Sequence, residues 1–384
     1  MGKQQVDLLI SGSVVLTMDP QHRVLRDGAV AVSGKQIVAV GPADELGRTY
    51  AAETSLDATN KAVMPGLVDT YGHAGHGMIR AIRHPELGWP TNDLYFHATD
   101  EDWWYAEGLL AAVERLRFGV TCGMSVIGAT PARMDSPVFA QRQAEAVQAV
   151  GIRGVLGVGP PDPFVSHLPE PWEATLWQEG RPHRHRFTYE QTLRNSESFL
   201  KEWHGAADGR VQVALHYPYL FGRHATHPRF PFTYTEAHVP VVIEKAEEIR
   251  DLASRYGVLL HSHAFRGSID FGLREFGAAR VRWLLGPDVV LAHCNDLAAE
   301  EVAVLGEQKV NVALGPFTAI ELLQAGANVA IATDGTAPYC SYDLFKEISR
   351  AMWGQWTRLG DFRLLPPGKA LRMVTIDAAR ALGL

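Results

Sequence analysis

The chain has 384 residues, of which 46% are hydrophobic and 21% charged, a composition that is typical of globular proteins and argues against disordered and fibrous classes. Acidic and basic residues are intermixed around a formal net charge of -7, so no basic stripe is available for a nucleic-acid backbone. No apolar run reaches the roughly 20 residues of a membrane span, and the first residues lack the apolar segment of a secretory signal. We expect a cytoplasmic protein without nucleic-acid or membrane partners.

Residues 1–62 are predicted to form a small β domain. Apolar and polar positions alternate in short bursts over residues 7–19 and again over 28–41, with Gly and Asp between the bursts. Alternation with a period of two residues is typical of strands that bury one face. We therefore expect a small β-sandwich or sheet at this end of the chain.

Residues 63–384 are predicted to form a (β/α)8 TIM barrel. Eight short runs rich in Val, Ile, Leu and Ala recur, separated by longer segments such as 104–119 and 240–257 that have helical periodicity and end at Gly. The runs cover residues 63–73, 120–127, 152–159, 211–219, 258–265, 289–297, 310–316 and 328–335. Eight buried parallel strands that alternate with helices are expected to close into a barrel of the α/β class.

Three segments that follow predicted strands are too long to be simple turns: 74–102, 160–186 and 220–238. In a barrel these connections lie on the face that carries the active site. These segments, together with the two residues that directly follow the first one, contain the aromatic residues Trp89, Trp103, Trp104, Trp172, Trp177, Phe221, Phe230 and Phe232. These aromatics either form a lid over a flat or apolar ligand or pack the long loops onto the barrel rim.

Side chains that can bind a metal ion stand at the carboxyl ends of several predicted strands. They are His73 in the first, His216 in the fourth, His261 and His263 in the fifth, His293 in the sixth and Asp334 in the eighth. A barrel brings these strand ends together at one point. Imidazole and carboxylate are the ligands that suit zinc or a similar divalent ion, so this pattern predicts a metal site.

These stretches resemble the amidohydrolase superfamily, in the branch that includes the cytosine, guanine and S-adenosylhomocysteine deaminases and the triazine hydrolases. The resemblance covers essentially the whole chain. Its matching segments are 63–81, 114–121, 216–219, 261–265, 292–316 and 322–335. In that family further strands follow a segment like the final IDAARALGL and complete the N-terminal sheet, so we expect the domain of residues 1–62 to be incomplete here, through truncation, processing or cover by another subunit.

The resemblance implies one divalent metal ion, zinc in the first place with iron or manganese as alternatives, held by His73, His263 and Asp334. Three protein ligands leave an open position for a water molecule, whose pKa the metal would lower to roughly 7. Asp334 would accept the proton of this water, and His293 would stabilise the charge that develops on the substrate. His216 resembles the family's substrate-contacting histidine, although it could also be a structural residue bonded to a loop carbonyl.

The first ligand of the family's His-x-His pair is replaced here by Tyr71, and a phenol is a poor zinc ligand unless it is ionised. Either three ligands suffice, or His76 or His261 takes the vacant place. Tyr71 itself, together with Trp89 in the first long loop, is then a candidate for contacting the substrate.

The second departure is Arg266, which stands where the deaminases of this branch carry a Glu that shuttles protons. Arginine cannot act as a general acid or base at neutral pH, but it can bind a carboxylate in bidentate fashion. This favours hydrolysis of an amide-like C–N bond in a substrate that carries a carboxylate.

The leading hypothesis is a metal-dependent hydrolase of a C–N bond, in an amide or a cyclic amide or amidine, of a small molecule that is aromatic or carboxylate-bearing. One alternative is a deaminase or dechlorinase of an N-heterocycle. A second is a binding protein that has lost catalysis, suggested by Tyr71 and Arg266. The resemblance also implies a homodimer or homotetramer.

Overall fold

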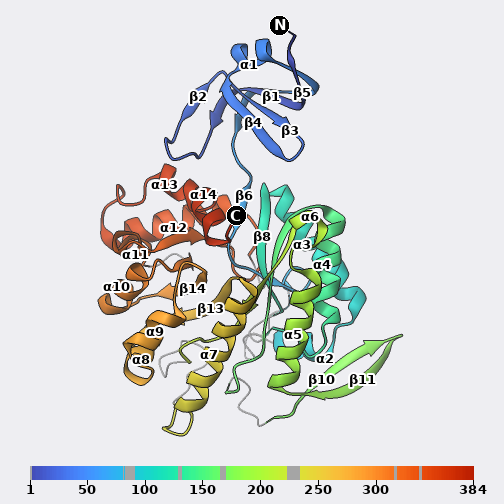
Figure 1. The fold of residues 1–384 in the computed structure, drawn as a ribbon, viewed down its shortest axis with the longest axis vertical. Coiled ribbons are helices and arrows are strands. Elements are labelled where there is room, and N and C mark those ends of the chain that lie inside the picture. Colours follow the sequence, from blue (N-terminus) through green and yellow to red (C-terminus); the bar gives the residue numbers. More distant parts are fainter. Residues whose placement is uncertain are drawn as a thin grey trace. The chain divides into compact units, whose positions relative to one another are not determined.

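The computed structural model describes residues 2–80, 82, 91–128, 132–164, 170–222, 234–314, 318–336 and 340–384 (Figure 1). The chain divides into two compact units, Met1–Gly66 and Leu67–Leu384. Each unit has its own sheet, and each is described by itself below.

The first unit is one five-stranded sheet with a short helix. Its elements are β1 (Gln4–Leu16), β2 (Val24–Arg26), β3 (Gly28–Ser33), β4 (Gln36–Pro42), α1 (Ala43–Thr49) and β5 (Tyr50–Val63). Strand β1 is central, because it pairs antiparallel with β2 and β3 and parallel with β5. Val6, Ala29, Ala31 and Leu46 form a small core of its own, so the alternating pattern of the sequence does mark a β unit.

The second unit is a parallel barrel, as predicted. Its strands are β6 (Leu67–Asp69), β7 (His73–Ala74), β8 (Val120–Ile127), β9 (Arg153–Val158), β12 (Val211–His216), β13 (Leu260–Phe265), β14 (Val289–Asn295), β15 (Asn311–Leu314) and β16 (Asn328–Ile331). Every pairing among them is parallel, and β6 and β7 both pair with β8, so they are two pieces of the first barrel strand. A bridge between Gly72 and Asp334 closes the ring between the first and last strands.

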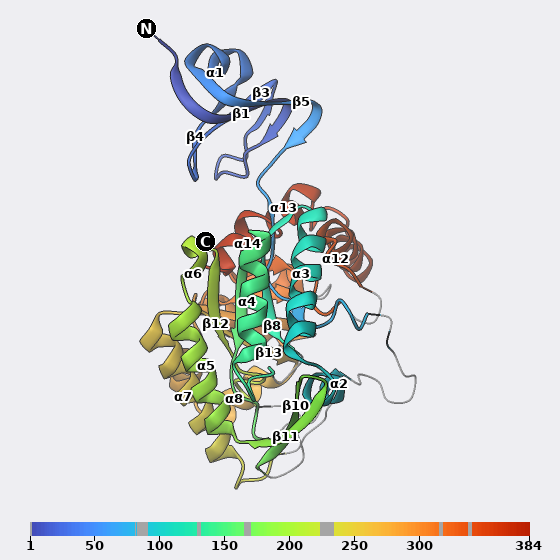
Figure 2. The same cartoon turned by 90° about the vertical axis from the view of Figure 1, so that its right-hand side faces the viewer.

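Helices surround these strands (Figures 1 and 2). They are α2 (Thr91–His97), α3 (Glu101–Arg117), α4 (Val138–Val150), α5 (Tyr189–Trp203), α6 (Ala206–Gly209), α7 (Val239–Tyr256), α8 (Ser268–Glu275), α9 (Ala278–Leu284), α10 (Ala299–Glu307), α11 (Ala319–Ala325), α12 (Leu344–Leu359), α13 (Pro367–Arg372) and α14 (Ile376–Ala381). Helix α3 begins where Asp100 accepts a hydrogen bond from the backbone of Trp103, and α7 ends at Gly257 in a left-handed conformation. In the described ranges no helix combines the length and the apolar character that crossing a membrane would require.

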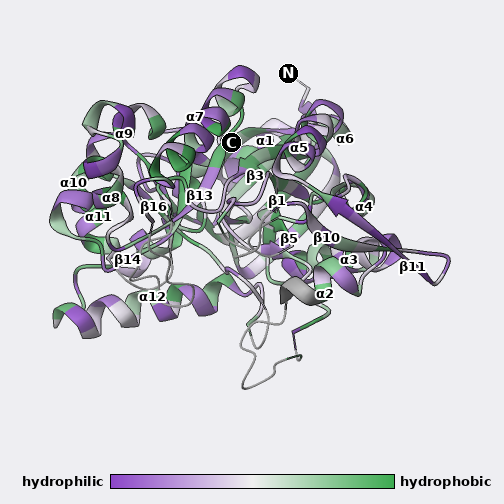
Figure 3. Cartoon of the chain, turned by 90° about the horizontal axis from the view of Figure 1, so that it is seen from below, coloured by the Kyte–Doolittle hydropathy of each residue, from purple (hydrophilic) through white to green (hydrophobic). Residues whose placement is uncertain are grey.

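The helices bury apolar residues against the barrel and leave polar ones outside, which Figure 3 shows as green and purple stretches along the same helices. Inside the barrel, Val68, Met124 and Ala330 pack together with Ala378 and Leu382 from the last helix and the residues after it. This packing joins strands from opposite ends of the sequence, so the strand ends that carry the site rest on a rigid base.

The segment 160–186 contains a β-hairpin, where a loop was expected. Strands β10 (Trp172–Gln178) and β11 (Arg181–Phe187) pair antiparallel, and Glu179 and Gly180 form the two-residue turn with positive φ angles. Trp172 is buried and Trp104 is fully buried, so these two aromatics serve packing. Trp89, Phe230 and Phe232 lie outside the described residues.

Candidate active site

Tyr71, His73 and His263 form a buried hydrogen-bonded centre between the first and fifth barrel strands. The Tyr71 hydroxyl lies 2.6 Å from Nε2 of His73 and 2.7 Å from Nε2 of His263. Nδ1 of His73 donates to the carbonyl of Gly128 at 2.8 Å, and Nδ1 of His263 donates to the carbonyl of Pro218 at 3.0 Å. Because a carbonyl only accepts, each Nδ1 carries a hydrogen, and the Nε2 atom of each ring faces the hydroxyl.

Asp334 lies beside this centre, three residues after the end of β16. Its Oδ1 is 3.4 Å from Nε2 of His73, and its Oδ2 is 4.0 Å from Nδ1 of His293. Burial acts to raise the pKa of the Asp334 carboxyl, but the contact with His73 and the nearby His293 outweigh it and hold the pKa well below its ordinary value. The carboxylate is therefore ionised, while 50% of its side-chain surface stays open to solvent.

The backbones of His293 and Asp334 are both in the left-handed region, with φ angles of 70° and 57°. L-residues rarely adopt this conformation, and it costs on the order of 1–3 kcal/mol unless neighbouring structure enforces it. For Asp334 the enforcement is visible, because its N–H donates to the carbonyl of Tyr71 at 3.0 Å. Strain at two of the predicted site residues is typical of functional positions.

His216 and His261 form a second buried pair behind Tyr71. Their Nδ1 atoms are 2.9 Å apart, and the His261 ring stacks on the Tyr71 ring with centroids 4.8 Å apart. Burial lowers the pKa of His216 to about 3 and lowers that of His261 well below its ordinary value. Both rings are thus neutral at physiological pH, and His216 bonds to a neighbouring side chain where a loop carbonyl was one of the expected partners.

His76 is buried and stacks on His73, with ring centroids 4.6 Å apart and planes 14° from parallel. Its loop is fixed by Glu107 of α3, a fully buried carboxylate that accepts hydrogen bonds from the backbones of Gly75, Gly77 and Met78 at 2.8–3.1 Å. Sequence reasoning missed Glu107, because a Glu within a charged helix gives no sign that it faces inward.

Arg266 lies exposed in the turn that follows β13. A second buried carboxylate, that of Glu301 in α10, accepts hydrogen bonds from the backbones of Gly267 and Ile269 at 3.0 Å and so fixes this turn. Glu301 was also not predicted. The turn that presents Arg266 is therefore rigid on one side, while the guanidinium itself is free to reach a ligand.

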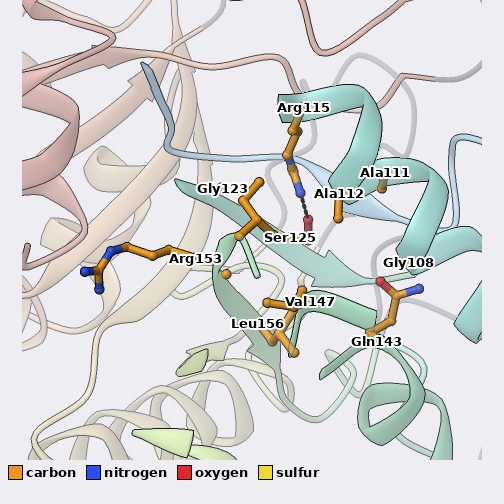
Figure 4. Close-up of a pocket in the computed structure, with 12 residues that line it drawn as sticks. Gly108, Ala111, Ala112, Arg115, Gly123, Ser125, Gln143, Val147, Arg153 and Leu156 are labelled. Carbon is orange, nitrogen blue, oxygen red and sulfur yellow. Dashed lines mark hydrogen bonds between the residues drawn. The ribbon is translucent and has the colours of Figure 1, made fainter. Parts of the chain in front are cut away.

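Asp69, Arg115 and Thr333 tie the first strand to the eighth directly next to the site. The fully buried Asp69 carboxylate accepts bonds from the backbone and the hydroxyl of Thr333 at 3.0 and 2.8 Å, and Arg115 lies 3.2 Å away. Arg115 also donates to Ser125 at 2.8 Å, as Figure 4 shows. The small pocket of Figure 4 lies between this arginine and residues of α4 and β9, so it belongs to the packing of helices on the barrel.

The donor atoms at this centre suit a divalent cation in their chemical type and in the direction they face. Two imidazole nitrogens and one ionised carboxylate are the ligands of catalytic zinc sites, and fixing each Nδ1 on a carbonyl is how proteins orient such histidines. Across the described ranges no three His, Cys, Asp or Glu side chains stand as an assembled metal site. The Tyr71 hydroxyl lies between the two imidazoles, so any ion at this point also meets its oxygen.

Comparisons with known proteins agree with this barrel. The amidohydrolase family profile matches residues 62–384, and a bacterial imidazolonepropionase-like composite domain matches residues 28–52. The 5-methylthioadenosine/S-adenosylhomocysteine deaminase of Syntrophobacter fumaroxidans is 30% identical over 401 residues, which cover 100% of this chain and 82% of that protein. The 5'-deoxyadenosine deaminase of Methanosarcina acetivorans is 29% identical over 402 residues, covering 98% of this chain and 80% of that protein.

Solved structures share the same fold. An adenosine deaminase from Xanthomonas campestris with bound zinc superposes with a TM-score of 0.77 at 23% identity, covering 100% of this chain and 81% of that one. An atrazine chlorohydrolase from Arthrobacter aurescens complexed with zinc gives 0.70 at 21% identity, covering 98% and 83%. The predicted resemblance and the predicted barrel are confirmed, and the chain belongs to the amidohydrolase family.

Proposed function

We propose that this chain is a hydrolase that cleaves a carbon–nitrogen bond of a small molecule and depends on one divalent metal ion, with zinc as the first candidate and iron or manganese as alternatives. The observation that carries the proposal is the aim of His73 and His263. Their Nε2 atoms face one point beside an ionised Asp334, and their Nδ1 atoms are fixed by carbonyls. Zinc in the two solved relatives supports the same assignment.

His73, His263 and Asp334 would hold the ion. When bound, a divalent ion acts as a Lewis acid and lowers the pKa of a water molecule to roughly 7. Asp334 is suited to accept the proton of the attacking water, because its carboxylate is ionised and open to solvent. It then returns that proton to the leaving nitrogen, which needs a proton to depart as an amine.

His293 stands on the other side of Asp334, with 21% of its side chain exposed. Its imidazole can donate a hydrogen bond to the oxygen or nitrogen that gains charge as the substrate carbon becomes tetrahedral. His216 lies fully buried against His261, so we assign it to the support of the site behind Tyr71. We assign direct contact with the substrate to Arg266.

The proposed substrate carries a carboxylate near the bond that breaks, because the exposed Arg266 follows the fifth strand only three residues after His263. Deamination of an N-heterocycle is the second candidate, favoured by relatives named as deaminases of adenosine derivatives. The absence of a Glu at position 266 weighs against it, since that residue shuttles the proton in the branch this chain resembles. Contact of Trp89 with substrate, a cytoplasmic location and a homo-oligomeric state stay proposals.

The deciding experiment combines metal analysis with a substrate screen. Protein purified without chelator should contain about one zinc, iron or manganese ion per chain. It should hydrolyse N-acyl substrates to a carboxylic acid and an amine, or open cyclic amides to single amino acids. Ammonia release from adenosine-type substrates would select the deaminase instead. A fully folded protein that takes up no metal and turns over neither class would be a binding protein, and the proposal would be wrong.

A further inference from the structure

The Tyr71 side chain is held in place on every side. Only 2% of its surface is exposed, its ring stacks on His261, and it meets the rings of His73, His263 and His293 edge-on with centroids 5.1, 5.5 and 5.8 Å away. Its backbone carbonyl is bonded to the N–H of Asp334. The hydroxyl therefore cannot swing away from the two imidazoles without disturbing four neighbouring rings.

The Tyr71 oxygen stands where two imidazole nitrogens converge. Nε2 of His73 faces it at 2.6 Å and Nε2 of His263 faces it at 2.7 Å, while Nδ1 of each ring is already bonded to a backbone carbonyl. All three side chains are buried. One oxygen and two nitrogens that face one another over such short distances are donors that a single small cation could share.

We propose that the phenolic oxygen of Tyr71 is itself a ligand of the metal ion, in the place that the family gives to the first histidine of its His-x-His pair; the inference rests on the proposed function. The alternative ligand for this place is His76, whose ring lies almost parallel to the His73 ring with the centroids 4.6 Å apart. Stacked rings point their nitrogens alongside one another, so His76 and His73 do not aim at a common point. In His261, Nδ1 is already bonded to His216, and the ring stacks on the ring of Tyr71.

Binding an ion requires a small adjustment. Ligand atoms at about 2.0–2.2 Å from a shared tetrahedral ion lie roughly 3.3 Å apart, whereas the Tyr71 oxygen now lies 2.6 and 2.7 Å from the two nitrogens. Small rotations of His73 and His263 open this space, and the hydroxyl hydrogen leaves to solvent, as ligand protons do when a metal binds. The resulting donor set has two nitrogens and two oxygens, with one more negative charge than the family's usual set.

The test uses the full chain, stripped of metal and reloaded separately with Zn²⁺ and Cu²⁺, with zinc content and the visible absorption spectrum of the copper form as readouts. Phenolate bound to Cu²⁺ gives a ligand-to-metal charge-transfer band that imidazole and carboxylate do not give. The wild type should bind zinc and show the band. Tyr71→Phe should lose the band and bind copper more weakly, on the order of tenfold or more, since even outer-shell changes cost 10–100-fold in metal affinity.

Tyr71→His should keep zinc and lose the band, which covers the case in which Tyr71→Phe does not fold. Two control variants should keep the band: Tyr95→Phe, which alters a buried tyrosine that stacks on His76 at 6.0 Å, and His76→Gln. Wild-type protein that binds copper without the band, or a band that survives Tyr71→Phe, would overturn the inference and leave the proposed function standing. If the wild type binds neither ion, the proposed function fails and the inference fails with it.

Discussion

Replacing Arg115 by Met should destabilise the barrel strongly, although residue 115 does not touch the substrate site. Arg115 as a whole is 6% exposed. Its guanidinium donates to Ser125, Asp69 and the carbonyl of Met124 at 2.8, 3.2 and 3.1 Å, and lies 4.3 Å from the centroid of the Tyr342 ring. Burial already raises the pKa of the Asp69 carboxyl, and Arg115 counters this. Removing one partner of a buried ion pair costs about 3–5 kcal/mol, because the other charge is left uncompensated.

Chemical denaturation followed by tryptophan fluorescence measures this loss. The critical comparison is between Arg115→Met and the double variant that also carries Asp69→Asn, because Asp69→Asn removes the carboxylate that has lost its partner. The double variant should recover at least about 1 kcal/mol relative to Arg115→Met alone, the lower bound for relieving an unmatched buried polar group. Asp69→Asn in the wild-type background should destabilise. An Arg115→Met protein as stable as the wild type, or a double variant weaker than the single one, would refute this account of how the first and eighth strands are joined.

Three further outcomes are expected. Asp334→Asn should fold normally and lose about 10²–10⁴ in kcat, the contribution of a general base, and an unchanged kcat would remove Asp334 from the chemistry. Arg266→Met should raise KM far more than it lowers kcat for a carboxylate substrate, whereas a larger effect on kcat than on KM would exclude binding of the substrate carboxylate by Arg266. In chelator-treated protein His216→Asn should flatten the pH dependence of stability. Burial lowers the pKa of His216 to about 3 in the folded chain, whereas the pKa is about 6.5 in the unfolded chain. As the pH falls below about 6.5 only the unfolded state takes up this proton, so the wild type loses about 1.4 kcal/mol of stability per pH unit through this residue. The exposed His183→Asn serves as its control, and equal slopes in the two variants would contradict the linkage.

The barrel could be predicted because each of its strands is buried on both faces. Burial on both faces requires an unbroken apolar run, and such runs are visible in a single sequence. The candidate site was predicted from the same pattern, since the polar residues that interrupt those runs at their carboxyl ends must share one edge. His73, His263, His293 and Asp334 were predicted as site residues in this way, and the structure places their side chains near one another.

Features that depend on contacts distant in sequence could not be predicted. Glu107 and Glu301 stand on helices rich in charge, and only the fold shows that both turn inward to hold backbone N–H groups of the loops carrying His76 and Arg266. The sequence contains only a weak signal for the hairpin β10–β11. Glu179 and Gly180 occupy its turn, but a Glu-Gly pair is a poorer signal than Asn-Gly, because Glu rarely adopts a positive φ angle.

The sequence motif and the structure lead to different conclusions about residue 71. As a motif, Tyr-Gly-His has lost a ligand, and it suggests a site that has degenerated. A phenol is longer than an imidazole, however, so from the same backbone position its oxygen extends to the point at which the nitrogens of His73 and His263 aim. Because the oxygen stands at the centre itself, this site needs the two histidines to draw apart before an ion can enter. Metal affinity should therefore depend on how firmly the carbonyls of Gly128 and Pro218 hold those rings, a property of the loops after the second and fourth strands that no motif contains.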